Sequence, residues 1–278
     1  MPTSYRPELD VSMALDSELA NYYQSLIGVL RWAVEIGRID ITTEVSMLAA
    51  HMALPREGHL YAVFRVFAYL KKKHNSRLVY DPSYPVIDFE QFKPREDWQN
   101  FYGDVKEAIP TNAPKPRGRA VILRCYVDSD HAGDKVTRRS RTGFIQMINI
   151  APIAWYSKKQ GSIEGATFGS EFVALKTAME ANRALRYKLR MIGIPIDGPT
   201  YFYCDNMSVV HNTTTPESML KKKSNSITYH AVREAVAMGE LLIAYIPTDH
   251  NIGDLMTKVL PGGERLTKLI QRLMWDVT

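Results

Sequence analysis

The chain has 278 residues, of which 45% are hydrophobic and 23% are charged, a composition typical of a folded globular protein. Its 35 Lys and Arg residues outnumber 30 Asp and Glu residues, and the resulting charge of +5 suits an anionic partner without forming a polybasic tail. The only cysteines, Cys125 and Cys204, exclude a disulfide framework and a Cys-x-x-Cys zinc site, so we expect a reducing, intracellular compartment. The N-terminus lacks a signal-peptide pattern and no run approaches 18 apolar residues, so neither secretion by that route nor a membrane span is expected.

The first 85 residues carry apolar residues at helical spacing. From Tyr22 to about Lys73 these residues recur every three or four positions, the period of an α-helix with one buried face. The two expected buried stripes are Leu26, Leu30 and Ala33, and Leu60, Phe64, Phe67 and Leu70. Pro55 lies between them and cannot sit inside a helix. The pattern therefore predicts a small unit of two or three helices over residues 1–85.

Residues 86–117 lose this periodicity. The segment has prolines at positions 94, 110, 114 and 116 among clustered polar residues, which is typical of a linker. We expect a linker over 86–117, with one short ordered piece, and a second domain over 118–278.

Residues 118–278 alternate between strand-like and helix-like patterns. Strands are expected at 120–128, 142–150, 152–157, 200–205 and 241–247, and helices at 166–192, 208–212, 227–239 and in the C-terminal tail. Short turns join the first three strands, which favours an antiparallel meander, whereas the last two strands follow helical crossovers, which favours parallel pairing. The order predicts an α/β domain with a mixed five-stranded sheet, three antiparallel strands and then two parallel ones, covered by helices.

Four carboxylates fall at the ends of these expected elements. Asp128 ends the first strand, Asp205 ends the fourth, Glu171 lies early in the long helix, and Asp254 starts the closing helix. Strand ends that share a direction open on one edge of a sheet, where α/β proteins build their sites. Clustered carboxylates repel one another unless cations neutralise them, and hard oxygen ligands suit Mg²⁺ or Mn²⁺. The four side chains therefore predict a divalent-metal site.

Each carboxylate taken singly has a simpler explanation. An Asp at a strand end is commonly a turn former, an Asp before a helix is commonly an N-cap, and a Glu in a first helical turn commonly serves the helix dipole. The order Asp, Glu, Asp, Asp on these particular elements is what favours a shared metal site.

Six stretches within residues 126–258 carry motifs: YVDSDHAGD, RRSRTGF, IAWYSKKQ, TFGSEFVAL, YCDN and GDLMTK. In this order they resemble the ribonuclease H domain at the C-terminus of copia-type retrotransposon polyproteins. They resemble, in turn, its first-Asp motif, its next two strands, the helix with the Glu, the third acidic position and the last acidic position. Upstream, YYQSLIGVLRWAVEIGRIDI resembles the end of the reverse transcriptase that precedes this domain. The resemblance implies a ribonuclease H-like sheet with helices on both faces, preceded by a helical remnant of the polymerase.

The chain departs from the family pattern in a few places. It has Gly169-Ser170-Glu171 where the family often has Glu-x-Glu, and Gly253 where alanine is common. It lacks the Tyr-x-Asp-Asp hairpin of the polymerase centre, the His/Cys set of an integrase and the Asp-Thr/Ser-Gly of an aspartic protease. We therefore interpret it as a tail fragment of a polyprotein, or a truncated or repurposed copy.

The resemblance implies two-metal hydrolysis of the RNA strand of an RNA–DNA hybrid. On this interpretation Asp128 bridges the two ions, Glu171 and Asp205 hold one, and Asp254 holds the other. His250 is a candidate for proton transfer or product release, although a polar loop histidine is an equal alternative. Asn206 is a candidate for contacting the nucleic acid near the 2′-hydroxyl, by which a protein tells RNA from DNA.

Basic residues follow the first acidic motif. Phosphate contacts supply most of the affinity of sequence-independent nucleic-acid binding. The candidates are Arg138, Arg139, Arg141, Lys158 and Lys159, and, with a solvated surface cluster as the favoured alternative, the lysine run at 221–223. Tyr126 and Trp155, at strand positions, are expected to be core residues and not base-stacking platforms.

Two rival functions stay open at the level of sequence. One is a catalytically silent or domesticated nucleic-acid-binding fragment of the polyprotein, and the other is a relative of transposases, against which the YCDN strand and the GDLMTK tail weigh. The expected partners are an RNA–DNA hybrid and the polymerase part that the chain lacks, without a membrane. By family analogy the protein is expected in cytoplasmic virus-like particles or the nucleus.

Overall fold

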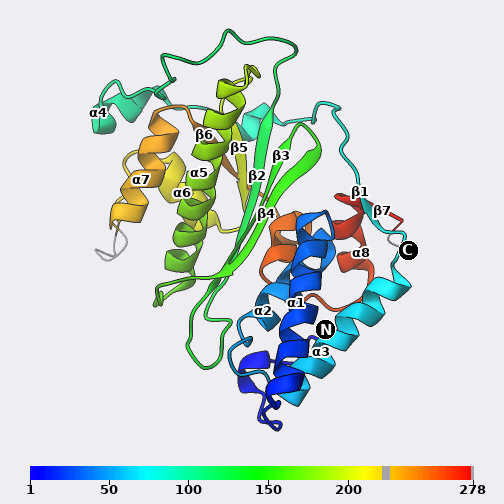
Figure 1. The fold of residues 1–278 in the computed structure, drawn as a ribbon. Helices are drawn as coiled ribbons and strands as arrows, with labels where there is room; N and C mark the ends of the chain where they lie inside the picture. The colour runs from blue at the N-terminus through cyan, green and yellow to red at the C-terminus, as the bar shows by residue number, and fades with distance from the viewer. Residues whose placement is uncertain (221–225, 277–278) are drawn as a thin grey trace.

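The computed structural model describes residues 1–220 and 226–276. Three helices at the N-terminus form a unit beside a five-stranded sheet, and three further helices cover the opposite side of that sheet (Figure 1). The N-terminal helices are α1 (Ser17–Glu35), α2 (Thr42–Ala49) and α3 (Glu57–Lys72), preceded by the 3₁₀ turn η1 (Pro7–Leu9) and interrupted by η2 (Ile39–Ile41).

The helical unit forms where the apolar spacing predicts it, but its buried faces differ from the expected stripes. Helix α1 begins after Asp16, whose carboxylate accepts a hydrogen bond from the Leu19 amide, and it buries Tyr23, Ile27, Leu30 and Val34. Helix α3 buries His59, Ala62, Val63 and Val66. Phe64, expected inside, is 44% exposed. The stripe expected for α3 was therefore wrong by about a quarter turn, because positions on both sides of it are apolar.

The segment after the helical unit packs on the sheet. It contains the short strand β1 (Arg77–Leu78), the 3₁₀ turns η3 (Phe89–Phe92) and η4 (Glu96–Trp98), and the short helix α4 (Gln99–Tyr102). Phe92 is buried, and its ring centroid lies 5.0 Å from that of Tyr201 in the sheet. Further along, Glu107 forms ion pairs with Arg186 and Arg190. Ordered structure in this segment is thus more extensive than the one short piece expected.

The sheet has the predicted mixed topology. Its strands are β2 (Leu123–Asp130), β3 (Arg141–Ile148), β4 (Ala151–Lys159), β5 (Thr200–Cys204) and β6 (Leu241–Tyr245). The spatial order is β4-β3-β2-β5-β6, with β4, β3 and β2 antiparallel and with β5 and β6 parallel to β2. This arrangement confirms the mixed five-stranded α/β sheet expected from the order of the elements, and it is the ribonuclease H-like fold that the resemblance implies.

Helices α5 (Thr167–Met191), α6 (Met207–Thr214) and α7 (Ser226–Ala237) cover one face of the sheet (Figure 1). Side chains alternate across a strand, so Cys125 and Val127 of β2 point to this face. They form one apolar core with Phe172 of α5 and Val232 of α7. Burial of this core is the main force that fixes α5, and with it Glu171, against the sheet.

The opposite face of the sheet carries the C-terminal elements. These are the 3₁₀ turns η6 (Thr248–His250) and η7 (Ile252–Met256), helix α8 (Glu264–Gln271) and strand β7 (Met274–Trp275), which pairs with β1. Tyr126 and Ile145 of the sheet pack there with Met256 and Ile270, and Ile39 of the helical unit joins the same core. Helical elements therefore lie on both faces, as predicted.

Buried and partly buried hydrogen bonds join the helical unit to the sheet and to η7. The Thr43 hydroxyl of α2 donates to the Leu255 carbonyl at 2.6 Å, and the Ser46 hydroxyl donates to the Ser157 carbonyl at 2.7 Å. The Arg141 guanidinium donates to the Ser46 hydroxyl, also at 2.6 Å. Helix α2 is thus attached both to β4 and to the turn η7.

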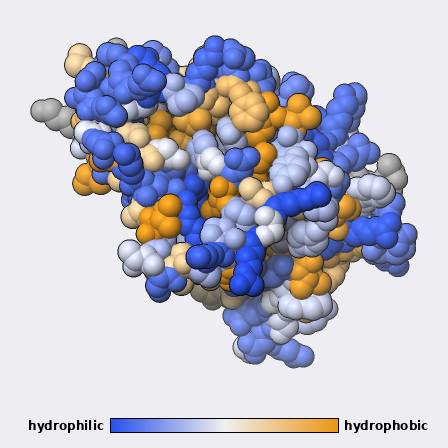
Figure 2. Space-filling model, turned by 90° about the horizontal axis from the view of Figure 1, so that it is seen from above, coloured by the Kyte–Doolittle hydropathy of each residue, from blue (hydrophilic) through white to orange (hydrophobic). Residues whose placement is uncertain are grey.

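The surface seen from above mixes hydrophilic residues with patches of apolar ones (Figure 2). Within residues 1–220 and 226–276, no helix has both the length and the hydropathy needed to cross a bilayer.

Candidate metal centre

Two neighbouring strands place Asp128 beside Asp205. Strands β2 and β5 are parallel, and Val127 of β2 pairs with Cys204 of β5. Asp128 is the next residue of β2, and Asp205 directly follows β5, so both carboxylates leave the sheet at the same edge. The expected position at strand ends is confirmed for Asp205, whereas β2 continues two residues past Asp128.

The turn η7 brings Asp254 to the same edge. Asn251, buried just before the turn, donates from its side-chain amide to the Val127 carbonyl at 2.9 Å and accepts from the Gly253 amide at 3.0 Å. The sequence predicts that Asp254 starts the closing helix, and this was wrong: η7 is a 3₁₀ turn, and α8 begins only at Glu264. Asn251 therefore fixes the position of Asp254 against β2.

Two glycines allow η7 to lie flat on the sheet. A Cβ atom at Gly143, which pairs with Asp128 across β2 and β3, would meet the Thr257 methyl carbon at 2.5 Å and the Met256 Cβ at 2.6 Å. A Cβ at Gly253 would come within 3.1 Å of the Val127 carbonyl carbon. This close approach is a physical reason for a glycine at position 253.

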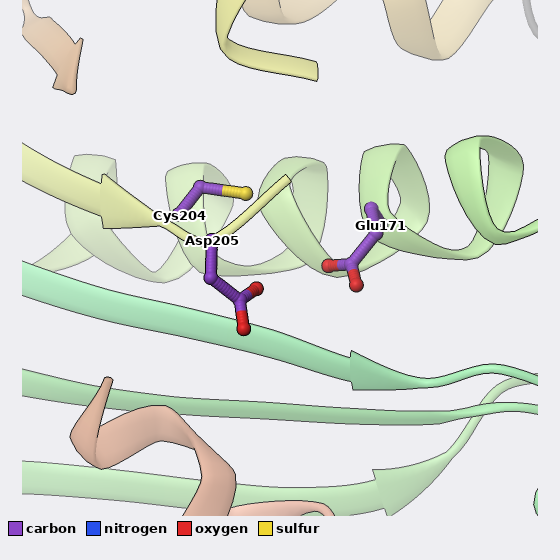
Figure 3. Close-up of side chains that lie close together, drawn as sticks. All are labelled: Glu171, Cys204 and Asp205. Carbon is purple, nitrogen blue, oxygen red and sulfur yellow. The ribbon is translucent and has the colours of Figure 1, made fainter. Parts of the chain in front are cut away.

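Glu171 approaches from the helix side. It is the fifth residue of α5, and its carboxylate points toward the end of β5, where Asp205 and Cys204 lie (Figure 3). The side chains of Asp205 and Cys204 diverge, with the sulfur on the side of α5.

The four carboxylates converge as two overlapping groups. In the first group, carboxylate oxygens lie within 4.8 Å of one another, one each from Asp128, Asp205 and Asp254. In the second group, the same limit holds for one carboxylate oxygen each of Glu171 and Asp205 and for the Cys204 sulfur. Asp205 belongs to both groups, whereas the sequence interpretation gives the shared position to Asp128. The division of ligands between two ions stays a prediction.

Burial makes this cluster electrostatically expensive. Glu171 is 4% exposed, and its Oε2 atom has no hydrogen-bond partner among the described residues. Burial, together with the charges of Asp128 and Asp205, raises the pKa of Glu171 well above its ordinary value. Burial and the charge of Asp128 likewise raise the pKa of Asp254 to about 6.

Cationic side chains of the chain itself also reach the cluster, which the sequence reasoning missed. The Lys258 ammonium lies 2.6 Å from Asp254 Oδ1 and 3.2 Å from Asp128 Oδ2. Arg265 pairs with the other oxygen of Asp254, and the Thr257 hydroxyl donates to Asp128. The available signal was the lysine of GDLMTK, four residues after Asp254 and therefore within reach of it.

The residues present fit a divalent cation. They supply hard carboxylate oxygens from four separate chain segments, and one of these oxygens, Oε2 of Glu171, is buried without a hydrogen-bond partner among the described residues. Cys204 adds a thiol whose pKa burial raises well above its ordinary value, so it behaves as a core side chain toward a hard ion.

The basic residues predicted to contact nucleic acid differ in how exposed they are. Arg138, Arg139 and Lys158 are exposed. Lys159 forms an ion pair with Asp134. Arg141 is only 8% exposed and is used to hold α2, so we leave it out of any nucleic-acid surface. The lysine run at 221–223 lies outside the described residues.

The remaining two candidates take other places. Asn206 caps α6, where its side-chain oxygen accepts from the amides of Ser208 at 3.1 Å and Val209 at 3.3 Å. His250 is exposed at the end of η6 and lines a hollow that also contains Tyr203 and Arg272. Neither residue belongs to the two carboxylate groups.

A small pocket of about 110 Å³ lies beside Lys258, between the sheet and the N-terminal unit. Lys258 and Asp130 line it from the sheet side, and Arg6 and His51 line it from the N-terminal side. Burial and the neighbouring His59 charge lower the pKa of His51 to about 4. Through this pocket the helical unit borders Thr257 and Lys258, which contact the carboxylates.

Comparison with known proteins identifies relatives among transposon polyproteins. The chain is 24% identical over 259 residues to a retrovirus-related Pol polyprotein from transposon RE1 of Arabidopsis thaliana, which is 93% of this chain. It is 25% identical over 239 residues to the Pol polyprotein from transposon TNT 1-94 of Nicotiana tabacum, or 86% of this chain. These matches confirm the resemblance seen in the motifs. The chain spans about 15% of the length of either relative.

Solved structures show weaker likeness. The structure of LC11-RNase H1 in complex with an RNA/DNA hybrid is 16% identical, with a TM-score of 0.40 over 49% of this chain and 93% of that one. No protein-family model matches the chain.

Proposed function

We propose that this chain is a divalent-metal-dependent endonuclease that hydrolyses the RNA strand of RNA–DNA hybrids, as the ribonuclease H part of a copia-type polyprotein. The observation that carries the proposal is the convergence of Asp128, Asp205 and Asp254 within 4.8 Å at one sheet edge, with Glu171 adjoining Asp205. Residues 1–85 are then the end of the reverse transcriptase, 86–117 the linker, and 118–278 the nuclease domain.

The carboxylates act as a rigid ligand frame for Mg²⁺ or Mn²⁺. Two such ions, when bound, supply an activated water for in-line attack on the phosphodiester and neutralise the leaving 3′ oxygen. Strands β2 and β5 fix Asp128 and Asp205, Asn251 fixes Asp254, and the core under α5 fixes Glu171. Because each ligand stands on a packed element, the site is preorganised.

The substrate is held through its phosphates. Three exposed cations lie near Asp128. Arg138 and Arg139 lie in the loop between β2 and β3, and Lys158 lies in β4, opposite Thr142, which pairs with Ser129 of β2. Contacts of this kind are independent of sequence and weaken with salt. We assign the recognition of the RNA 2′-hydroxyl to polar groups around Glu171. Asn206 also lies at this edge, but its side-chain oxygen already accepts a hydrogen bond from the Ser208 amide at the start of α6.

The test is cleavage of a labelled RNA–DNA hybrid by the full chain. We expect cleavage of the RNA strand with Mg²⁺, no cleavage with EDTA, and no cleavage of RNA or DNA duplexes. Asp205→Asn removes a ligand common to both groups and should abolish cleavage, whereas the matched control Asp197→Asn, outside both groups, should retain it. Equal activity of Asp205→Asn and the unmodified chain would refute the ligand assignment.

A catalytically silent nucleic-acid-binding module is the second candidate. The observation that favours it is the pairing of Lys258 and Arg265 with Asp254, since these cations already neutralise part of the cluster. This function predicts salt-dependent binding of the hybrid without cleavage at any Mg²⁺ or Mn²⁺ concentration, and binding that Asp205→Asn leaves unchanged.

A further inference from the structure

Lys258 occupies the position between two of the proposed metal ligands. Its ammonium contacts Asp254 Oδ1 at 2.6 Å and both oxygens of Asp128, at 3.2 and 3.4 Å. The Asp254 and Asp128 side chains are 0% and 1% exposed. Buried carboxylates require a compensating charge, and here the chain supplies it.

The other end of the cluster has no such cation. Within the two described stretches of the chain, no lysine or arginine forms an ion pair with Glu171 or Asp205. Glu171 Oε2 is also buried, and no group in the described part of the chain forms a hydrogen bond with it. The two ends therefore differ in charge compensation, although Asp205 is shared between them.

We propose that Lys258 is a resident counter-cation that competes with a divalent ion for Asp128 and Asp254, so that the two ends of the cluster bind metal with unequal affinity. An ion enters the Glu171–Asp205 end without displacing a protein charge. An ion at the Asp128–Asp254 end first displaces the ammonium. The inference rests on the proposed function for the identity of the ligands, and adds how the site is loaded.

The Lys258 side chain is suited to this exchange. It is 35% exposed, so its end can move toward water along the pocket that it lines. A lysine is a compact point charge on a flexible four-carbon stem, unlike the planar guanidinium of arginine.

The experiment is Mn²⁺ binding to the full chain, followed by the electron paramagnetic resonance signal of free Mn²⁺, which requires no catalysis. The unmodified chain should show one stronger and one weaker site. Lys258→Met removes the competitor and should tighten the weaker site at least tenfold, about 1.4 kcal/mol. Lys268→Met, the same change at an exposed lysine of α8 paired with Glu264, should leave both sites unchanged.

A second measurement separates competition from misfolding. In EDTA, Lys258→Met should unfold at a lower temperature than the unmodified chain, and Mn²⁺ should reverse that loss, because the ion replaces the missing charge. Lys258→Gln serves as a second variant if Lys258→Met does not fold. A variant that stays unfolded or equally destabilised at saturating Mn²⁺ would contradict the exchange.

The outcomes also separate this inference from the proposed function. Equal Mn²⁺ affinities for Lys258→Met, Lys258→Gln and the unmodified chain, together with hybrid cleavage, would overturn the role of Lys258 and leave the nuclease intact. No Mn²⁺ binding by any of the three would overturn both. Binding by the variants alone would show that Lys258 blocks the site and would support the inference.

Discussion

Replacing Glu171 by glutamine should stabilise the metal-free protein while weakening its metal site. The glutamine side chain has the same shape but no charge, so it removes the cost of burying the charge of a carboxylate that is 4% exposed. Glutamine still places a polar atom where Glu171 Oε2 has no hydrogen-bond partner among the described residues, so the expected gain comes from the charge alone. We therefore expect Glu171→Gln to raise the free energy of unfolding in EDTA.

The sign follows from proton linkage. Because the pKa of Glu171 is raised in the folded protein, its contribution to stability is lost as the pH rises above the ordinary pKa of 4.5. A difference of one pKa unit between the folded and unfolded states corresponds to about 1.36 kcal/mol, so we expect a gain of roughly 1–3 kcal/mol at about pH 7.5. The gain should shrink as the pH falls toward 4.5, where the unfolded glutamate is protonated too.

The assay is urea unfolding in EDTA, followed by tryptophan fluorescence at several pH values. Glu180→Gln is the matched control, since Glu180 lies on the same helix, is 56% exposed and pairs only weakly with Lys176 at 3.1 Å. It should change stability by less than about 0.5 kcal/mol. A loss of stability in Glu171→Gln, or a gain that does not depend on pH, would refute the electrostatic account of this residue.

Three further perturbations follow from the same geometry. Because the pKa of Asp254 is raised to about 6, protons should compete with metal for this carboxylate below that pH. The increase in melting temperature caused by Mg²⁺ should therefore be smaller at about pH 5 than at about pH 7.5. An increase of the same size at both pH values would contradict this. Arg186→Met should lower the free energy of unfolding in urea by roughly 2–4 kcal/mol, because it removes a two-point contact at 2.7 Å with the half-buried Glu107; a loss under about 0.5 kcal/mol would contradict this. Thr43→Val should lower the free energy of unfolding by about 1–2 kcal/mol, because the carbonyl of Leu255, beside Asp254, loses its hydrogen-bond donor. It should also weaken Mn²⁺ binding measured by calorimetry. An unchanged Mn²⁺ affinity would show that α2 does not support η7.

The sheet was predictable because its signals are local. Strand alternation and short turns define β2, β3 and β4, and the helical period over 166–192 defines α5 to within a residue at each end. Once the strand order is known, parallel pairing of β2 and β5 brings Asp128 next to Asp205. The order of the elements was therefore enough to predict that these carboxylates lie at one edge of the sheet.

The remaining features depend on contacts between distant segments. Arg141 looks like a surface cation in sequence, but helix α2 covers it and Ser46 accepts its hydrogen bond. Phe64 has apolar neighbours on either side, so periodicity alone does not select the face that α3 buries. Lys258 is inside a motif, yet only the fold shows that its ammonium lies between Asp128 and Asp254.

These long-range contacts also connect the helical unit to the chemistry of the site. Thr43 supports the turn that carries Asp254, and Arg6 and His51 line the pocket beside Lys258. The helical unit is therefore part of the surroundings of the proposed metal centre and not only an attachment to it.

The central claim is that one cluster of carboxylates holds divalent cations, and the most direct measurement is the position of Mn²⁺ in a crystal of the full chain, located by anomalous scattering. The account predicts a strong peak within bonding distance of Asp205 and of at least one of Asp128, Glu171 and Asp254. Saturating Mn²⁺ with no peak at this sheet edge, and with Lys258 and Arg265 still paired to Asp254, would contradict it.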